Sequence, residues 1–306
     1  MSRLAKSDVV DSVLGTAEAV GDAWSWLIVS DAIVEGTSRF DEFQRRLGIA
    51  RSTLSNRLAS LCTHGVMVRQ GREYVLTDRG QDLLAWVMTA TAWGDRWHSD
   101  GLDMPLRAAH IGCTERVHGE LRCGSCDEVV RAHDVSFDRK PPALGTSTEP
   151  AQRRRVPSLA VLQRLQPHAI AATLQVIGDR WSALVIRELF YGSHRFDDFQ
   201  RRLGIATNIL SARLLRLVEH GVVDKRVYLH HPIRHEYWLT EKGLDLYPVP
   251  LSMLAWGDRW LADRTAEVRL THRPCGKHLS PVLTCSVCAR PLTRTDLAFE
   301  QSTQII

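Results

Sequence analysis

Apolar residues recur at three- and four-residue spacing over residues 170 to 190, which is the pattern of an amphipathic helix with one buried face. A second, short helix is expected over residues 196 to 203, because acidic side chains open it and Gly204 follows it. A third helix should begin with Thr207 as its N-cap and end before Gly221. Two helices joined by so tight a turn predict a helix-turn-helix.

The residues after Gly221 have the pattern of a β-hairpin. Two runs rich in β-branched and aromatic residues, VVDKRVYL and HEYWLT, flank a His/Pro/Arg tip. Thr240 should then cap a further helix that runs to about Trp260, with a kink at Pro248 and Pro250. Helix, helix-turn-helix, hairpin and closing helix together predict a winged helix.

The same unit occurs twice along the 306-residue chain. Residues 39 to 50 read RFDEFQRRLGIA and residues 195 to 206 read RFDDFQRRLGIA, while AWGDRW at 92 to 97 returns at 255 to 260. The second copy carries seven more residues at the hairpin, so the tip of the first copy is reduced to residues 70 to 72. A repeat of this length indicates a duplicated domain and not a solenoid unit.

Six of the seven cysteines lie in two clusters of identical spacing. The clusters read His110-x2-Cys113 followed by Cys123-x2-Cys126, and His272-x2-Cys275 followed by Cys285-x2-Cys288. Two ligands at x2 spacing fold around a metal ion, and two such pairs within one hairpin would supply a closed set of one histidine and three cysteines, which suits zinc. We therefore expect two structural zinc ions per chain. The alternative is reduced cysteine pairs in a metal-free hairpin, or disulfides formed on oxidation.

The predicted fold class is α+β, mainly α, with two tandem winged helix-turn-helix domains that are each followed by a small zinc-binding hairpin with one histidine and three cysteines as ligands. The expected boundaries are a first winged helix domain at residues 1–106, a first zinc hairpin at 107–133, a linker at 134–166, a second winged helix domain at 167–265, a second zinc hairpin at 266–296 and a tail at 297–306. The linker expectation follows from the KPPALGTSTEP stretch and the arginine run after it.

Composition and charge narrow the class of protein. The hydrophobic fraction of 44% and the charged fraction of 24% are near the globular average. The chain contains no membrane-length apolar run and its first residues lack a secretory pattern, so we expect a cytoplasmic protein without a membrane partner. The formal net charge is −3 over residues 1 to 133, +3 over 134 to 167 and +4 over 168 to 306. This distribution permits a polyanionic partner for the second half.

Taken together, these motifs resemble the HxlR family of bacterial winged-helix transcriptional regulators. The resemblance rests on GDRW, RFDDFQRRLGI, LSARLLRLVEHGVV, HPIRHEYWLTEKG and AWGDRW, and it covers about residues 13 to 97 and 170 to 262. It implies sequence-specific DNA binding, usually by a two-fold dimer built through terminal helices. Redox-sensing members carry a cysteine ahead of the first helix, whereas Val10 and Pro167 lie near that position here, so thiol sensing is not expected.

A helix-turn-helix places the third helix of each copy in the major groove. The candidate DNA-binding residues of these helices are Arg51, Ser52, Thr53, Ser55, Asn56 and Arg57 in the first copy, and Thr207, Asn208, Ser211 and Arg213 in the second. Arginine pairs with guanine and asparagine with adenine, so Arg51, Asn56 and Asn208 are the best candidates for reading bases. Arg57 and Arg213 occupy matching positions and are expected to hold phosphate.

The hairpin tips supply a second set of basic residues. The candidates are Arg69 and Arg72 in the first copy, and Arg226, His230, His231 and Arg234 in the second. These side chains suit phosphate contact or insertion into the minor groove. We therefore expect unequal readers, with the second copy contributing more of the electrostatic affinity.

The predicted function is that of a sequence-specific DNA-binding transcriptional regulator. Its two fused modules would pair within one chain as a pseudo-dimer on double-stranded DNA, with a further homodimer as a second arrangement. The tryptophans repeated in both copies are expected to pack in the core and between the copies, and not to line a small-molecule effector pocket. The alternative function is a protein-interaction adaptor with a degenerate first module and structural zinc hairpins. An enzyme is not expected, because four protein ligands leave zinc no open position and no catalytic set lies at useful spacing.

Overall fold

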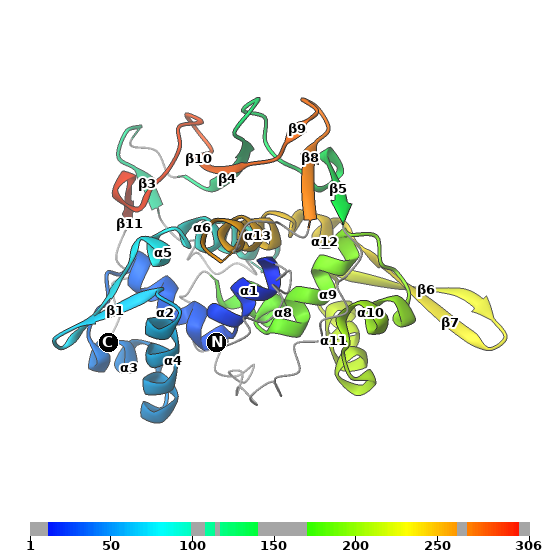
Figure 1. Cartoon of the computed structure of the whole chain (residues 1–306), viewed down its shortest axis with the longest axis horizontal. Coiled ribbons are helices and arrows are strands. Elements are labelled where there is room, and N and C mark those ends of the chain that lie inside the picture. Colours follow the sequence, from blue (N-terminus) through cyan, green and yellow to red (C-terminus); the bar gives the residue numbers. More distant parts are fainter. Residues whose placement is uncertain (1–11, 99–107, 114–116, 140–169, 262–267, 300–306) are drawn as a thin grey trace, which may run out of the picture.

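Two winged helices lie side by side, and a layer of short strands covers one side of them in the computed structural model of the chain (Figure 1). The structure describes residues 12–98, 108–113, 117–139, 170–261 and 268–299. We call residues 12–139 the first half and residues 170–299 the second half. Residues 140–166 of the expected linker lie outside the described part of the chain.

Each winged helix is built from the same succession of elements. The first contains α1 (Ser12–Ala19), α2 (Ala23–Val34), α3 (Phe40–Leu47), α4 (Arg51–Thr63), β1 (Met67–Gln70), β2 (Glu73–Leu76), α5 (Asp78–Gln81) and α6 (Leu84–His98). The second contains α8 (Ala171–Ile177), α9 (Arg180–Phe190), α10 (Phe196–Leu203), α11 (Thr207–Glu219), β6 (Val223–His230), β7 (Ile233–Leu239), α12 (Glu241–Asp245) and α13 (Pro248–Trp260). The duplication predicted from the sequence is thus a duplication of structure.

The helix expected over residues 170 to 190 is two helices, α8 and α9, and this prediction was wrong. Between them the backbone of Asp179 is extended, with φ −138° and ψ 155°. The Asp179 carboxylate accepts hydrogen bonds from the backbone N–H groups of Trp181 and Ser182, at 3.0 and 3.2 Å. Asp179 therefore starts a new helix as its N-cap. The apolar periodicity did not reveal the break because apolar residues continue on both sides of it.

The turn of the second helix-turn-helix follows the prediction except at its cap. Helix α10 has the predicted bounds, and Gly204 after it has φ 59°, in the left-handed region that glycine adopts most easily. Thr207 is the first residue of α11 and not its N-cap, a position held by Ala206. The Thr207 hydroxyl instead accepts a hydrogen bond from the side-chain amide of Gln200, at 3.0 Å. This bond joins α10 to α11 across the turn.

The closing helix of the second copy is interrupted and not merely kinked. Thr240 caps its first part as predicted, because its hydroxyl accepts a hydrogen bond from the backbone N–H of Gly243 at 3.1 Å. Helix α12 ends at Asp245, and α13 begins at Pro248. Proline is tolerated in the first turn of a helix, where its missing N–H would have no partner in any case.

The strands outside the wings form a layer that we call the ribbon layer. It contains β3 (Ala108–His110), β4 (Gly119–Cys123), β5 (Val135–Arg139), β8 (Val268–His272), β9 (Lys277–His278), β10 (Pro281–Cys285) and β11 (Leu297–Phe299). Strand β4 pairs with β10, β3 with β11 and β5 with β8, all antiparallel. Each of these three pairings joins the first half to the second.

The ribbon layer changes two expected boundaries. Strand β5 occupies the start of the expected linker at 134–166, and β11 occupies the start of the expected tail at 297–306. Both segments are strands because each pairs with a strand of the opposite half, β5 with β8 and β11 with β3. A partner so distant in sequence leaves no local signal.

The four tryptophans of the two AWGDRW repeats join the two halves below the ribbon layer. Each donates its indole Nε1–H to the opposite half, in the pairs Trp93 to Lys242 O (3.0 Å), Trp256 to Arg79 O (2.8 Å), Trp97 to Asp245 Oδ2 (2.8 Å) and Trp260 to Asp82 Oδ2 (2.8 Å). The first and second pairs are equivalent in the two copies, as are the third and fourth, so the halves are related by an approximate two-fold axis. The prediction that these tryptophans pack between the copies is confirmed.

Each helix-turn-helix has its own apolar core. In the second copy, Phe199, Leu210, Leu214 and Leu217 are each at most 1% exposed, and the equivalent positions of the first copy are equally buried. Full burial of such a side chain contributes about 1.5–3 kcal/mol. No helix among the described residues is long and apolar enough to cross a membrane.

Candidate DNA-binding face and metal-binding clusters

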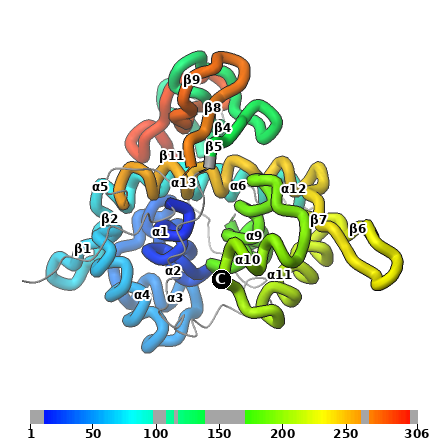
Figure 2. Tube along the Cα trace, turned by 45° about the vertical axis from the view of Figure 1, so that its right-hand side comes forward, coloured from blue at the N-terminus to red at the C-terminus, as the bar shows by residue number. Residues whose placement is uncertain are grey.

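Helices α4 and α11, which we call the reading helices, lie on the side of the molecule opposite the ribbon layer (Figures 1 and 2). The hairpins β1–β2 and β6–β7, which we call wing one and wing two, extend outward at opposite ends of the molecule. Both views show this arrangement. One face of the chain therefore presents two reading helices flanked by two wings.

Most of the predicted reading residues are accessible on that face. Side chains that are exposed to solvent are Arg51, Ser52, Ser55 and Asn56 on α4, and Thr207, Asn208 and Ser211 on α11; Thr53 is half-buried. The Arg51 guanidinium lies over the ring of Phe40, 5.1 Å from its centroid. The N-terminal turns of both reading helices thus offer polar groups to a ligand, as base readout requires.

Two predicted residues have another role. Arg57 Nε lies 2.6 Å from an Asp22 carboxylate oxygen, and Arg213 Nε lies 2.9 Å from an Asp179 carboxylate oxygen. The two aspartates are only 2% and 9% exposed. Both guanidinium groups are therefore paired with buried carboxylates of their own winged helix, and the phosphate role expected for them is not what their positions favour.

The aspartates were missed as site residues although the sequence carried a signal for them. Asp22 and Asp179 stand in GDAW and GDRW, at equivalent places in the two copies. Each caps its own helix, α2 or α9, and each receives an arginine from the reading helix behind it. An acidic residue just before an apolar run is a helix N-cap signal. Only the fold shows that the same carboxylate also fixes the reading helix.

The wings differ in length and in surface chemistry. Arg226, His230, His231 and Arg234 are exposed on wing two, and Arg69 and Arg72 are exposed on the shorter wing one. Wing two also exposes apolar side chains, of which Ile233 at the tip is 67% exposed. Arg195, which the sequence did not single out, lies 4.5 Å from the centroid of the Tyr228 ring and 3.0 Å from Glu236. Wing two is thus the larger surface, and basic groups surround its apolar tip.

The eight predicted metal ligands form two clusters, but not the two that the sequence suggested. Cluster one contains His110, Cys113, Cys285 and Cys288, and cluster two contains Cys123, Cys126, His272 and Cys275. Each cluster takes two ligands from each half, whereas pairing within one hairpin was expected. That expectation was wrong because β4 pairs with β10 of the other half, and so carries Cys123 away from His110.

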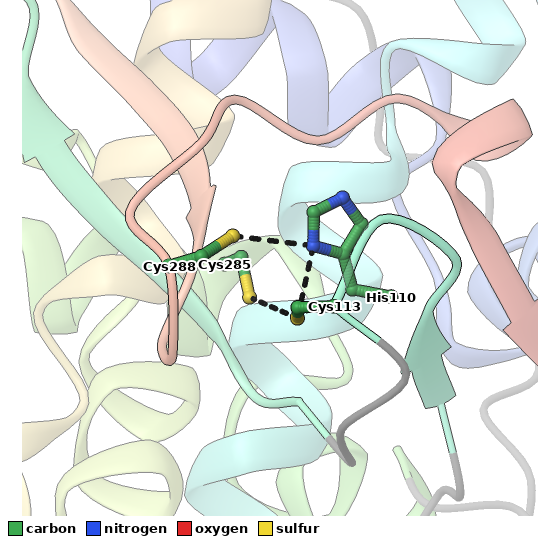
Figure 3. Close-up of side chains that lie close together, drawn as sticks. All are labelled: His110, Cys113, Cys285 and Cys288. Carbon is green, nitrogen blue, oxygen red and sulfur yellow. Dashed lines mark hydrogen bonds between the residues drawn. The ribbon is translucent and has the colours of Figure 1, made fainter.

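Figure 3 shows cluster one, in which two segments distant in sequence bring their side chains together. Cys113 Sγ lies 3.8 Å from Cys285 Sγ, and His110 Nδ1 lies 3.3 Å from the sulfurs of Cys113 and Cys288. In cluster two, Cys123 Sγ lies 3.9 Å from Cys275 Sγ. Thiolates bound tetrahedrally at about 2.3 Å from a zinc ion would be about 3.8 Å apart. Both clusters could therefore hold a metal ion, and their cysteines are free thiols that are not joined as disulfides.

Hydrogen bonds favour the thiolate form of one cysteine in each cluster. Burial opposes ionisation of Cys123, but hydrogen bonds from the backbone N–H groups of Ser125 and Cys126 and from the Cys126 and Cys275 thiols together lower the pKa of this thiol. Burial likewise opposes ionisation of Cys285, and backbone N–H groups of Cys288 and Val287 lower its pKa. Thiolate is the form in which cysteine binds metal.

Comparison with known proteins identifies relatives of both halves. The family model described as HxlR-like helix-turn-helix matches residues 19–101 and 176–265. An uncharacterized HTH-type transcriptional regulator of Mycobacterium tuberculosis (strain ATCC 25618 / H37Rv) is 38% identical over 138 residues, covering 45% of this chain and 87% of the relative.

Two further relatives each match about a third of the chain. An uncharacterized HTH-type transcriptional regulator of Synechocystis sp. (strain ATCC 27184 / PCC 6803 / Kazusa) is 36% identical over 102 residues, covering 33% of this chain and 76% of the relative. One from Bacillus subtilis (strain 168) is 35% identical over 92 residues, covering 30% of this chain and 72% of the relative. Each relative is thus matched over most of its own length by less than half of this chain.

Proposed function

Because the chain belongs to the HxlR-like helix-turn-helix family, whose members are transcription regulators and not enzymes, we propose that its two winged helices act as a pseudo-dimer on one double-stranded DNA site. The observation that carries this proposal is the position of α4 and α11 on one face, in two halves related by an approximate two-fold axis. Two-fold helix-turn-helix proteins bind half-sites about 34–36 Å apart. Here one chain would supply both readers.

The two half-sites should differ in sequence. At the first position of the reading helix, Arg51 in α4 corresponds to Thr207 in α11, and Asn56 corresponds to Ala212. Arginine and asparagine each form two hydrogen bonds with one base, which threonine and alanine cannot reproduce. The proposed operator is therefore asymmetric, with Arg51 and Asn56 reading one half-site and Asn208 reading the other.

The wings supply sequence-independent affinity in this proposal. Arg226 and Arg234 of wing two would contact phosphates, and Ile233 at its tip has the apolar character of side chains that enter the minor groove. Arg69 and Arg72 of the shorter wing one would contribute a smaller share of this affinity. The proposal assigns no DNA contact to Arg57 and Arg213, because their guanidinium groups are paired with buried carboxylates.

We also propose that each cluster holds a structural zinc ion. Three cysteine sulfurs and one imidazole nitrogen form a donor set that zinc favours, and four protein ligands leave no position for water. Sulfur separations of 3.8 and 3.9 Å support the same assignment. Metal analysis of the chain purified without chelator should find two zinc ions per chain, and fewer than one would refute the assignment.

Selection of random duplex DNA by the purified chain tests the function. We expect one bipartite sequence to be bound about a thousandfold or more tightly than a scrambled duplex at physiological salt. Asn56→Ala should then relax base preference in one half-site only, and Asn208→Ala in the other only. Lys277→Ala removes an exposed charge from the ribbon layer and serves as the control, which should leave both preferences unchanged.

Two results would contradict this proposal. Binding that is weak, sequence-blind and abolished by salt would mean that the winged helices do not read an operator, and the protein-interaction adaptor would then be the better function. Relaxed preference in the same half-site for both asparagine variants would mean that the two copies do not read one site together.

A further inference from the structure

We propose that each cluster of one histidine and three cysteines is a metal clamp between the two halves, so that metal loading determines how firmly the two reading helices are held together. The inference rests on the metal binding and DNA reading proposed above and adds a regulatory role to them. Its starting point is the ligand set, since His110 and Cys113 are completed by Cys285 and Cys288 of the other half. Cluster two is completed in the same way. Neither cluster can close within one half.

The strand pairing supports the crossed arrangement independently of the cysteines. In the β4–β10 pair, Leu121 lies opposite Leu283, and these are equivalent residues of the two copies. On the other side of the helices, Asp22 lies opposite Asp179, which are also equivalent. Two equivalent residues can face each other only across the symmetry axis. One approximate two-fold axis therefore passes through the ribbon layer and between the helices that support the readers.

The ribbon layer is seated directly on the helices that join the halves. A Cβ atom at Gly119 of β4 would lie 2.8 Å from Met88 Cβ in α6 and 2.7 Å from Leu283 Cδ1 in β10, which is closer than side chains approach one another. Glycine therefore allows the strand to contact both α6 and its partner strand. Helix α6 also carries Trp93, which donates to Lys242 of the second half.

Each end of the ribbon layer also touches the winged helix of the opposite half. Arg294 of the second half donates from Nε to the carbonyl oxygen of Ile33 in α2 of the first half. Phe137 of β5 in the first half lies 5.0 Å from Tyr191, centroid to centroid, directly after α9 of the second half. A metal ion that fixes the ribbon strands therefore also fixes these contacts across the axis.

These contacts give the metal a physical effect on DNA binding. A ligand that binds only the paired arrangement stabilises that arrangement by RT ln(1 + L/Kd), where L is the free ligand concentration, so the stabilisation grows as L rises above Kd. Two reading helices held at a fixed separation bind two half-sites with avidity, which weakens when the separation varies because the effective concentration of the second reader falls. We expect the metal to be a soft or borderline divalent ion, because the donors are cysteine sulfurs and imidazole nitrogens.

Two double variants of the full chain test which ligands share a metal. Cys113→Ser with Cys285→Ser removes two ligands from cluster one and leaves cluster two complete, so one zinc per chain should survive a chelator that leaves the wild type fully loaded. Cys113→Ser with Cys123→Ser removes the same number of cysteines but one from each cluster, so no tightly held zinc should survive. The reverse result would show that ligands pair within each half, and it would overturn the clamp.

Thiol cross-linking of the wild-type chain decides the pairing if both variants lose all metal through misfolding. After gentle metal removal, a diazene oxidant takes two electrons and two protons from a neighbouring thiol pair and leaves a disulfide. Peptides joined through Cys113 and Cys285, or through Cys123 and Cys275, are expected, because these sulfurs are 3.8 and 3.9 Å apart. Peptides joined through Cys113 and Cys123 in their place would overturn the proposal.

The last experiment tests whether metal binding by the clusters changes the affinity for DNA. Cys113→Ser with Cys285→Ser should lower affinity for the selected two-half-site duplex at least tenfold while changing affinity for a single half-site less than twofold. Equal affinity for the two-half-site duplex with and without metal would overturn the regulatory part of the proposal. Failure of the proposed function is distinguishable, because the wild-type chain would then contain no zinc or select no operator.

Discussion

Asp22 and Asp179, which are equivalent residues of the two copies, face each other in an antiparallel backbone bridge. Each carboxylate caps a helix of its own half and pairs with an arginine of its own reading helix. The two reading helices are thus connected through Arg57, Asp22, Asp179 and Arg213. This chain of contacts crosses the two-fold axis on the side of the helices away from the metal clusters.

Replacing Asp179 tests this connection. Asp179→Ala removes an N-cap and leaves Arg213 without its carboxylate partner, so the free energy of unfolding should fall by about 1–3 kcal/mol. Affinity for the selected operator should fall as well, because α11 loses its anchor. Asp197→Ala is the matched control, since Asp197 is exposed in the first turn of α10; its expected cost is below about 1 kcal/mol. Equal losses in urea unfolding for the two variants would argue against the anchor.

The tryptophans between the halves should contribute equally to the free energy of unfolding if the two halves are equivalent in energy as well as in geometry. Trp93→Phe and Trp256→Phe each remove one hydrogen bond to a carbonyl oxygen of the opposite half, with an expected cost of about 1 kcal/mol each. Urea unfolding measures both costs, and Trp238→Phe on wing two, where Trp238 is 37% exposed, is the control. A cost confined to one of the two interface variants would show unequal halves.

The unequal wings predict unequal salt dependence. Arg226→Ala with Arg234→Ala should reduce the slope of log K against log salt concentration by about 1.8, since each phosphate contact contributes about 0.9. Arg69→Ala with Arg72→Ala in the shorter wing one should reduce it less. Anisotropy titrations of the selected duplex at several salt concentrations give both slopes. Equal reductions in slope would show that the two wings contribute equally to the electrostatic part of DNA affinity.

Protonation of His220 should account for part of the fall in the free energy of unfolding at acid pH. Burial, with Arg216 and Lys242 nearby, lowers the pKa of this histidine below its ordinary value of 6.5. The unfolded chain therefore binds the proton more readily than the folded chain. The contribution of neutral His220 to stability is complete above about pH 6.5, and it is lost as pH falls through the lower pKa of the folded state. Urea unfolding at pH 7.5 and pH 5 should show a smaller loss for His220→Gln than for the wild type. His230→Gln on exposed wing two is the control, and it should lose as much as the wild type.

Much of the local structure followed from the sequence because its causes are local. Helix α10 has its predicted bounds because acidic residues open it and Gly204 closes it, and Thr240 caps α12 through a hydrogen bond three residues away. The two misplaced strands needed information from outside their segments, whereas the missed break at Asp179 has a local N-cap signal in GDRW. The break at Asp179 was hidden by continuous apolar spacing, and β5 and β11 are strands only because the opposite half supplies their partners.

The sequence by itself determined that the chain is a duplicated winged helix and which eight side chains could bind metal. It could not determine how those ligands are grouped, because the two copies have identical spacing and every grouping satisfies it equally. Tertiary structure decided the grouping through contacts between residues far apart in sequence, the β4–β10 pairing and the crossed tryptophan bonds. Two equivalent strands that pair across a symmetry axis must exchange their ligands, so each cluster belongs to both halves.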